Sequence, residues 1–325
     1  MRPSNPVFLI AAALSFSLSA CSINTLALRA TADALSSPGS NEVFSGDDDP
    51  QLISEALPFA IKLYESLLSQ LPGHDGLALT TGSLIVMYAN AFVQAPAEML
   101  DDEAYELRRK ELSRAKKLYV RGYGTLVSRL GAKHPGIDAA LDEAARKAAL
   151  EKCAESDVPF LYWAGAAAMA AYSLDPLDVG LGTRLGLVRD YMARAYALDP
   201  DYGRGAIDDF YVSYYAGLPA GMGGSMEKAE AHLERAIEKS GGLSAGPYVS
   251  AALSLGVPRQ DYPYFKRMIA AALAIDPDAD HEGRLANIIA QRKAEYLIAS
   301  AEYLFITTED ASDDASDDAT EGDIE

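Results

Sequence analysis

The stretch from Tyr191 to Lys239 reads YMARAYALDPDYGRGAIDDFYVSYYAGLPAGMGGSMEKAEAHLERAIEK and decides the fold class. Near its end, one helix face carries a small, a large and a small apolar residue at i, i+4 and i+7, namely Ala229, Leu233 and Ala236. Met192 and Ala195 have the same offsets ahead of Pro200, and proline cannot continue a helix. The stretch therefore predicts the end of one helical repeat followed by a whole second one.

The same spacing with a proline stop recurs elsewhere in the chain: Ala60, Tyr64, Leu67, Pro72; Tyr123, Val127, Leu130, Pro135; Ala164, Ala168, Ala171, Pro176; and Phe265, Ile269, Ala272, Pro277. These offsets match the second helix of a tetratricopeptide repeat. The stops do not keep the period of about 34 residues of that repeat, and its first-helix signature is mostly absent. We therefore predict an all-α fold, a degenerate tetratricopeptide-like array of helical hairpins, in preference to generic helical packing.

The N-terminus reads as an export signal. Residues 1–20 contain Arg2 and an apolar run too short to span a bilayer as a permanent helix. The run ends in Leu18, Ser19, Ala20 and Cys21, which fits the bacterial lipobox, so Cys21 is predicted to be acylated and to become the mature N-terminus. A serine at position 22 favours sorting to the outer membrane. We expect a lipid-anchored protein on the periplasmic side of the outer membrane of a Gram-negative bacterium.

Three further segments follow from composition and periodicity. Residues 21–48 are predicted to be the lipidated N-terminus and a tether, and residues 49–306 a helical domain. Asp49 and Pro50 are a suitable start for its first helix, because a carboxylate caps free N–H groups and proline is tolerated in the first turn. Residues 307–325 are expected to form a disordered acidic tail.

Charge excludes one class of partner. The chain has 325 residues, 49% of them hydrophobic, and a formal net charge of −19 at pH 7. Nucleic acid is not an expected partner, because its phosphates would be repelled. The basic residues between positions 101 and 130 lie among acidic ones and predict a long solvated helix rather than an anion site.

Two apolar segments are expected in the core. Residues 84–93 are apolar nearly all round, and we interpret them as a buried helix because no partner strand accompanies them. The first helix is expected to be lined by Leu52, Ala56, Phe59, Ile61, Leu63, Leu67 and Leu68. Cys153, which has no disulfide partner if Cys21 carries lipid, is expected to be a small buried residue.

The sequence carries no catalytic constellation that we recognise. A phosphate-binding loop, a dinucleotide fingerprint and the H-E-x-x-H motif are absent, and the four histidines are scattered. Asp208 and Asp209 are paired carboxylates, but such pairs are common in a helical protein of this charge. We predict no enzyme activity, no cofactor and no metal.

Aromatic density is the unusual feature that remains. Tyr202, Phe210, Tyr211, Tyr214 and Tyr215 surround a glycine-flanked arginine, Arg204, and Tyr162 and Trp163 are expected to face the same region. Aromatics with a few polar groups commonly line a ligand cleft. A tyrosine-rich core between repeats has the same appearance, so both interpretations stay open.

In its order of motifs, the chain resembles the T component associated with tripartite ATP-independent periplasmic (TRAP) transporters, a lipoprotein family often called TatT. The resemblance covers roughly residues 18–305. After the lipobox it rests on Asp47 to Pro50, Ala56 to Phe59, Lys62, Tyr88 to Phe92, Leu118-Tyr119, Arg121-Gly122, Leu161 to Trp163, Leu198 to Pro200, Gly205-Ala206, Tyr214-Tyr215, Leu218-Pro219, Gly223-Gly224, Ala229 to Ala236, Arg284 to Asn287, Gln291 and Ala294.

The resemblance implies a helical, repeat-like lipoprotein with a cleft or pore that can form a trimer. It implies association with the periplasmic solute-binding protein, the P component, and delivery of a small, apolar organic ligand to the permease. The residues that we assign on this basis to the cleft or an interface are Tyr162, Trp163, Arg204, Tyr214, Tyr215, Arg284 and Asn287. Arg284 and Asn287 share a helix face and could bind a carboxylate or tie adjacent repeats together.

Two other functions remain as alternatives. A general tetratricopeptide-like scaffold would bind envelope-assembly proteins in a groove. An enzyme would need an acid/base site near Asp208 and Asp209.

Overall fold

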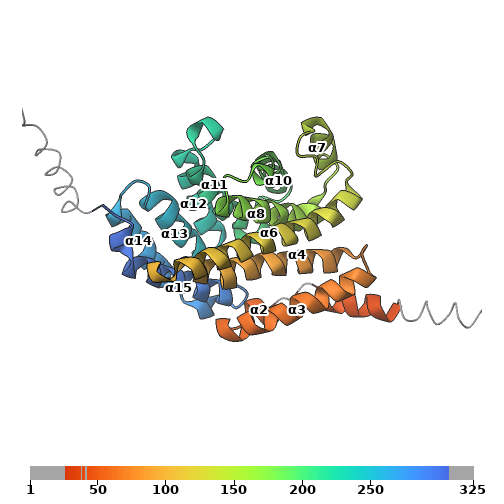
Figure 1. Cartoon of the computed structure of the whole chain (residues 1–325), viewed down its shortest axis with the longest axis horizontal. Helices are drawn as coiled ribbons and strands as arrows, with labels where there is room; N and C mark the ends of the chain where they lie inside the picture. Colours follow the sequence, from red (N-terminus) through yellow and green to blue (C-terminus); the bar gives the residue numbers. More distant parts are fainter. Residues whose placement is uncertain (1–25, 38, 41, 307–325) are drawn as a thin grey trace, which may run out of the picture.

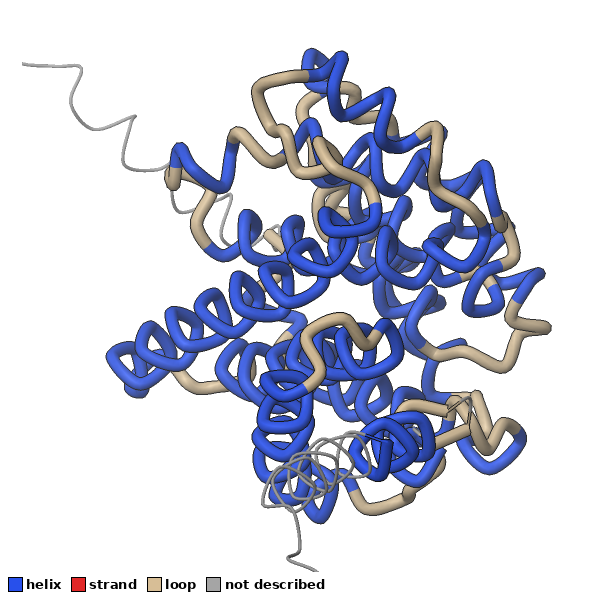
Figure 2. Tube along the Cα trace, turned by 90° about the vertical axis from the view of Figure 1, so that its right-hand side faces the viewer, coloured by secondary structure: helices blue, strands red, loops and turns tan. Residues whose placement is uncertain are grey.

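The computed structural model describes residues 26–37, 39–40 and 42–306. Helices and loops account for all of this part of the chain, which contains no strand (Figure 2). The predicted all-α class is therefore confirmed. The predicted signal peptide, Cys21 and the acidic tail lie outside the described residues.

The principal helices follow the predicted periodicity, and residues 83–87 are helical as expected. Their bounds are α2 (Glu42–Ser45), α3 (Pro50–Gln70), α4 (Asp75–Ala89), the π-helix η1 (Asn90–Gln94), α5 (Ala95–Glu98), α6 (Tyr105–Lys133), α7 (Glu143–Leu150), α8 (Val158–Leu174), α9 (Val179–Gly182), α10 (Leu185–Leu198), α11 (Ala206–Gly217), α12 (Met226–Lys239), α13 (Gly246–Ala251), the π-helix η6 (Ala252–Gly256), α14 (Tyr262–Leu273) and α15 (Arg284–Ala299).

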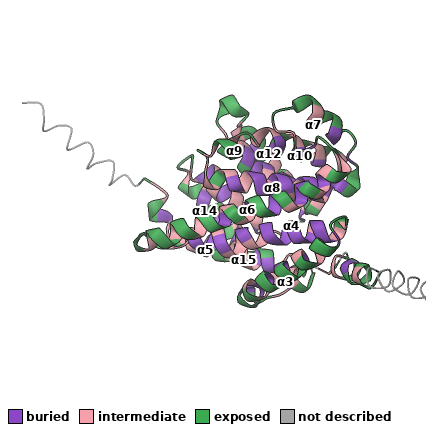
Figure 3. Cartoon of the chain, turned by 45° about the vertical axis from the view of Figure 1, so that its right-hand side comes forward, coloured by how far each residue is buried: buried purple, intermediate pink, exposed green. Residues whose placement is uncertain are grey.

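The first half of the domain is a stack of neighbouring helices. α3 packs on α4, α4 on α6, α6 on α8 and α8 on α10 (Figure 1). Glycines bring α4 and α6 close together, because a Cβ on Gly82 would lie 2.5 Å from Leu126 and one on Gly122 would lie 2.7 Å from Val86. Buried residues accordingly concentrate on α4 and α8, in the middle of the stack (Figure 3).

The second half folds back onto the first. α11 pairs with α12, and α13, α14 and α15 pack on one another. α15 then lies beside α2 and α3, so the end of the domain contacts its beginning (Figure 1). An ion pair of 3.0 Å also joins Lys293 on α15 to Glu98 on α5, in the first half of the domain. The last helix of the domain therefore contacts its first half at several places.

The residues of the repeat spacing face the core. Val127, Ala168, Met192, Leu233 and Ile269 hold the equivalent central position in five helices, and all five are buried. This spacing places one stripe against the neighbouring helix, which is why it identified the packing faces.

The first helix differs from its expected lining. Asp49 does cap α3, accepting from the N–H groups of residues 51 and 52, and Pro50 opens the helix. Leu52, Phe59 and Leu63 are nevertheless exposed, Phe59 at 75%. The reason is that α3 is an outer helix of the stack. Its buried inward face contains Ile61, as expected, together with Ile53, Leu57 and Tyr64, which the expected lining did not include.

Part of the segment expected to be a tether packs on the domain. Residues 26–35 are helical and Ala32 is buried against α3. The Tyr64 hydroxyl donates a hydrogen bond of 2.9 Å to the carbonyl of Leu35. The packed region thus begins before position 49, because the apolar residues Leu28, Ala32 and Leu35 recur at helical spacing and cover α3.

The continuous helical stretch Asp75–Glu98, formed by α4, η1 and α5, is the one described segment long and apolar enough to cross a membrane by length and composition alone. In its most apolar window, 61% of the residues are buried inside the fold. It is a core helix of the domain, as predicted for residues 84–93.

Candidate functional site

A cavity of about 550 Å³ lies between the two halves of the domain. Its wall is built by α4, η1 and α5 from the first half, by α8 and α11, and by α13, η6 and α15 from the second half. Most of its lining is apolar: Val86, Met87, Ala91, Phe92, Ala95, Trp163, Ala166, Ala170, Val249, Leu253, Leu285, Ala286, Ile289 and Ala290. Small-molecule sites in proteins typically have this size and character.

Both π-helices of the described chain contribute to the cavity wall. In η1 the N–H of Ala95 bonds to the carbonyl of Asn90, and in η6 the N–H of Val257 bonds to the carbonyl of Ala252 at 3.1 Å. η1 lies inside the continuous helix from α4 to α5, and η6 ends the helix that α13 begins. Such wide turns are frequent at functional sites. The sequence analysis missed both, because no residue pattern distinguishes a π turn from an α turn.

Polar lining residues on the first-half side are bonded to one another. The Tyr119 hydroxyl donates to the Gln94 carbonyl oxygen at 2.6 Å, and the Gln94 amide donates to Glu98 at 2.7 Å. Glu98 also receives the Lys293 ammonium at 3.0 Å. On the far side, the hydroxyls of Ser213 and Ser254 lie 3.3 Å apart. The hydrogen-bonding groups of these six residues therefore largely satisfy one another.

Asp209, in the first turn of α11, is the exception. It lines the cavity, yet its Oδ1 atom is buried with no hydrogen-bond partner among the described residues. Burial raises the pKa of Asp209 to about 6, and the Ser250 hydroxyl offsets only part of that rise. A carboxylate oxygen that is buried without a hydrogen-bond partner costs stability, which makes Asp209 a candidate for a functional residue.

Tyr162 and Trp163, predicted as cleft residues, both line the cavity. Their ring centroids are 5.4 Å apart in an edge-to-face arrangement, and Tyr202 lies 5.2 Å from Tyr162. Burial raises the pKa of Tyr162 far above its ordinary value, and the nearby Asp209 carboxylate adds to that rise. The tyrosine therefore remains a neutral hydroxyl at the same wall as Asp209.

Tyr214 and Tyr215 belong to a different cluster and are not among the lining residues. Tyr215 stacks on Tyr211 with centroids 5.3 Å apart, and both rings pack on His232 of α12. These rings form the core between α11 and α12. Of the two interpretations left open for the aromatic residues, a cleft fits Tyr162 and Trp163, and a core between repeats fits Tyr214 and Tyr215.

The remaining predicted residues tie loops to helices and also lie outside the cavity lining. Arg204 pairs with Asp280. Arg284 pairs with Asp278 at 2.9 Å and donates to the carbonyl of residue 46 at 3.2 Å. Asn287 is buried, accepts from the N–H of residue 245 and donates to the carbonyl of residue 243, both at 2.9 Å. The sequence analysis left two roles open for Asn287, binding a carboxylate or tying adjacent repeats together. These contacts fit the second role.

Asp208 is fully buried among cationic partners from α12. It receives His232 at 2.6 Å, Lys239 at 2.8 Å and Arg235 at 3.1 Å. Burial alone would raise the pKa of Asp208, but these three hydrogen bonds outweigh it and lower the pKa to about 2. The carboxylate remains ionised and fully bonded, and it joins α11 to α12.

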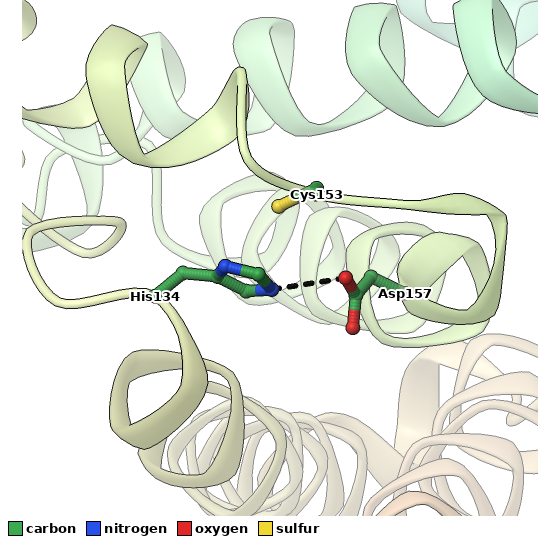
Figure 4. A group of neighbouring side chains, drawn as sticks. All are labelled: His134, Cys153 and Asp157. Carbon is green, nitrogen blue, oxygen red and sulfur yellow. Dashed lines mark hydrogen bonds and ion pairs between the residues drawn. The ribbon is translucent and has the colours of Figure 1, made fainter.

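One cluster has the composition of a partial metal site. Ligand atoms of His134, Cys153 and Asp157 lie within 4.8 Å of one another (Figure 4). Asp157 is already occupied, accepting from Lys133, from His134 at 2.9 Å and from the N–H of Ala154 at 3.1 Å. Burial raises the pKa of the Cys153 thiol to about 11, whereas a metal needs the thiolate. The cluster is therefore best explained as a tie between the end of α6 and the start of α8.

Comparison with known proteins places this architecture in a family. The family model described as TRAP transporter T-component matches residues 46–305. An uncharacterized protein of Treponema pallidum (strain Nichols) is 34% identical over 275 residues, which cover 84% of this chain and 85% of that protein. This family is associated with a bacterial membrane transport system. The chain belongs to the TRAP transporter T-component family.

Proposed function

We propose that this protein serves a TRAP-type transport system from the periplasmic side of the membrane, where it binds the solute-binding P component and holds a small organic ligand. Membership in the T-component family supports the role in transport. The observation that carries the ligand part is the apolar cavity of about 550 Å³ between the two halves of the domain. Its size suits a small organic molecule rather than an ion or a peptide.

The cavity wall supports a binding role in two further ways. Trp163, Tyr162 and Phe92 supply flat apolar surface from two different helices, and such rings give large contact area at low entropic cost. The two π turns lie in this wall, in η1 and η6. No catalytic role is part of the proposal, because Asp208 is committed to three structural hydrogen bonds.

Anchoring and assembly belong to the same proposal. An acyl chain on Cys21 would hold the protein at the outer membrane, facing the periplasm, and a trimer is the expected assembly. Cys21→Ala should release the protein from the membrane fraction. Retention of an acylated, membrane-bound variant would contradict the anchor, and a monomeric mass by light scattering would contradict the trimer.

Affinity purification of the full chain from its native envelope tests the proposed partners. Mass spectrometry should find a periplasmic solute-binding protein and a small organic molecule in the eluate. Recovery of envelope-assembly factors without a solute-binding protein would favour the scaffold function instead.

A matched pair of variants separates the cavity from the partner surface. Ala166→Phe places a bulky ring into the cavity, whereas Ala193→Phe places the same ring at an exposed position on α10. Ala166→Phe should abolish recovery of the small molecule, and Ala193→Phe should preserve it. Equal recovery with both variants would show that the molecule binds elsewhere.

A further inference from the structure

We propose that the cavity selects an apolar molecule whose polar group is a hydrogen-bond donor, a protonated amine above all, and that Asp209 receives this group. The inference rests on the proposed function only in requiring that the cavity holds a ligand. It adds the chemical class of that ligand and assigns a specificity-determining residue.

The charges around the cavity support this choice. Lys293 is the one cationic side chain in the described lining, and its ammonium is 3.0 Å from Glu98. Asp209 adds a second carboxylate, and among the described residues it forms no ion pair with a cationic side chain. The lining therefore has an excess of negative charge when Asp209 is ionised, and a ligand carboxylate would be repelled in a low-dielectric space.

The hydrogen-bonding capacity points to the same residue. Gln94 uses its carbonyl oxygen for Tyr119 and its amide for Glu98, and the serine hydroxyls of α11 and η6 face each other. The Oδ1 atom of Asp209 remains as a strong acceptor that is buried and unbonded within the described chain. A ligand N–H or O–H can satisfy it, and an ammonium does so with a charge-assisted bond.

The local fold holds Asp209 at the cavity wall. Its neighbour Asp208 is bonded to three side chains of α12, which fixes the first turn of α11. At Gly205, just before α11, a Cβ would lie 3.2 Å from the backbone of Ala236, so α11 and α12 are in close contact there. A carboxylate on such a rigid turn is preorganised, so ligand binding does not cost the conformational entropy of ordering the acceptor.

Trp163 provides a built-in reporter, because it is the single tryptophan of the chain and lines the cavity. We would titrate the full chain carrying Cys21→Ala, so that no acyl chain or detergent competes, with octylamine, 1-octanol and octanoate at pH 7.5. The three probes share one apolar tail and differ in their polar group. Quenching of tryptophan fluorescence should give octylamine the lowest Kd, about tenfold or more below that of octanoate, with 1-octanol between them.

Two variants locate the source of the preference. In Asp209→Asn, the Kd of octanoate should exceed that of octylamine by about threefold or less. Glu234→Gln removes the same charge from an exposed position on α12 and should leave the ratio unchanged. This control is needed because a net charge of −19 attracts any cation to the surface.

Several outcomes would overturn the inference. These are octanoate binding as tightly as octylamine, an amine preference that survives in Asp209→Asn, and failure of all three probes to quench Trp163. The proposed function has its own test in recovery of a solute-binding protein. A cavity that prefers octanoate, in a protein that still recovers this partner, would leave the function standing and refute only the ligand class.

Discussion

Asp208 and Asp209 are adjacent in sequence, and the fold gives them opposite surroundings. Asp208 is fully buried, with Lys239, Arg235 and His232 as hydrogen-bond partners and a pKa lowered to about 2. Asp209 faces the cavity, with one oxygen unbonded among the described residues and a pKa raised to about 6. Successive residues on a helix point about 100° apart, so one turn of α11 presents one carboxylate to α12 and the other to the cavity.

The difference separates two uses of a buried carboxylate. The Asp208 cluster stabilises the contact between α11 and α12, because every ion in it has a partner. Asp209 lowers the stability of the ligand-free protein, since an ionised group is buried and the Ser250 hydroxyl compensates for only part of the cost. A residue of the second kind is the better candidate for a functional one.

The largest effect should come from Asp208→Asn. The amide would leave Lys239, Arg235 and His232 without their shared carboxylate, at a cost of roughly 3–5 kcal/mol in the free energy of unfolding. Urea unfolding of the full chain, followed by helical circular dichroism, measures this loss. The exposed control Glu234→Gln should change the free energy by no more than about 0.5 kcal/mol. Equal stabilities of the two variants would remove the structural role of Asp208.

Removal of one cation should have a smaller effect. Lys239 is 19% exposed and its ammonium lies 2.8 Å from the Asp208 carboxylate. Lys239→Met keeps the aliphatic chain but removes this bond, and we expect a loss of about 2 kcal/mol by the same unfolding measurement. A loss exceeding that of Asp208→Asn would mean that Lys239 has a larger role outside the cluster.

Asp209→Asn should act in the opposite direction. A rise in pKa from 3.8 to about 6 corresponds to about 3 kcal/mol of unfavourable free energy when the group is ionised. The asparagine amide remains buried and incompletely bonded, so it should recover about 1–2 kcal/mol at pH 7.5. An increase in the urea midpoint checks this, and a decrease would show that Asp209 has a stabilising partner after all.

Sequence analysis could predict the packing faces of the repeat helices. It could not predict which residues of α11 pack in the core and which line the cavity. The stripes that include Leu233 and Ile269 are buried as predicted, since a fixed spacing selects a fixed helix face. On α11 the tyrosines are dense all round. Only three-dimensional packing sends Tyr215 towards α12 and Tyr214 into the core shared with α8 and α10, while Asp209 and Ser213 face the cavity.

The same limit explains the other differences. Phe59 is exposed because it lies on the outward face of α3, and an outer position in a stack is not encoded in periodicity. Lys293 and Glu98 form an ion pair although 195 residues separate them in the sequence. This contact depends on the packing angles of all the helices between them, which sequence periodicity does not specify. Trp163 lies in the cavity wall, and its role in binding stays a prediction.

The smallest expected effect is a difference in how the free energies of unfolding of the Asp208 and Asp209 variants depend on pH. The folded pKa of Asp209 is raised, so its protonated form favours the fold, and the stability it contributes is full below about pH 4 and is lost as pH rises through about 6. The advantage of Asp209→Asn over the wild type should therefore be absent near pH 4 and grow to its full 1–2 kcal/mol by about pH 7.

The folded pKa of Asp208 is lowered to about 2, so its contribution is present above the unfolded value of 3.8 and is lost only as pH falls towards 2. The deficit of Asp208→Asn should accordingly stay level across the same window. Urea midpoints of both variants at half-unit steps from pH 4 to 7.5 check the contrast, and parallel profiles would show that the two carboxylates do not have the opposite environments described above.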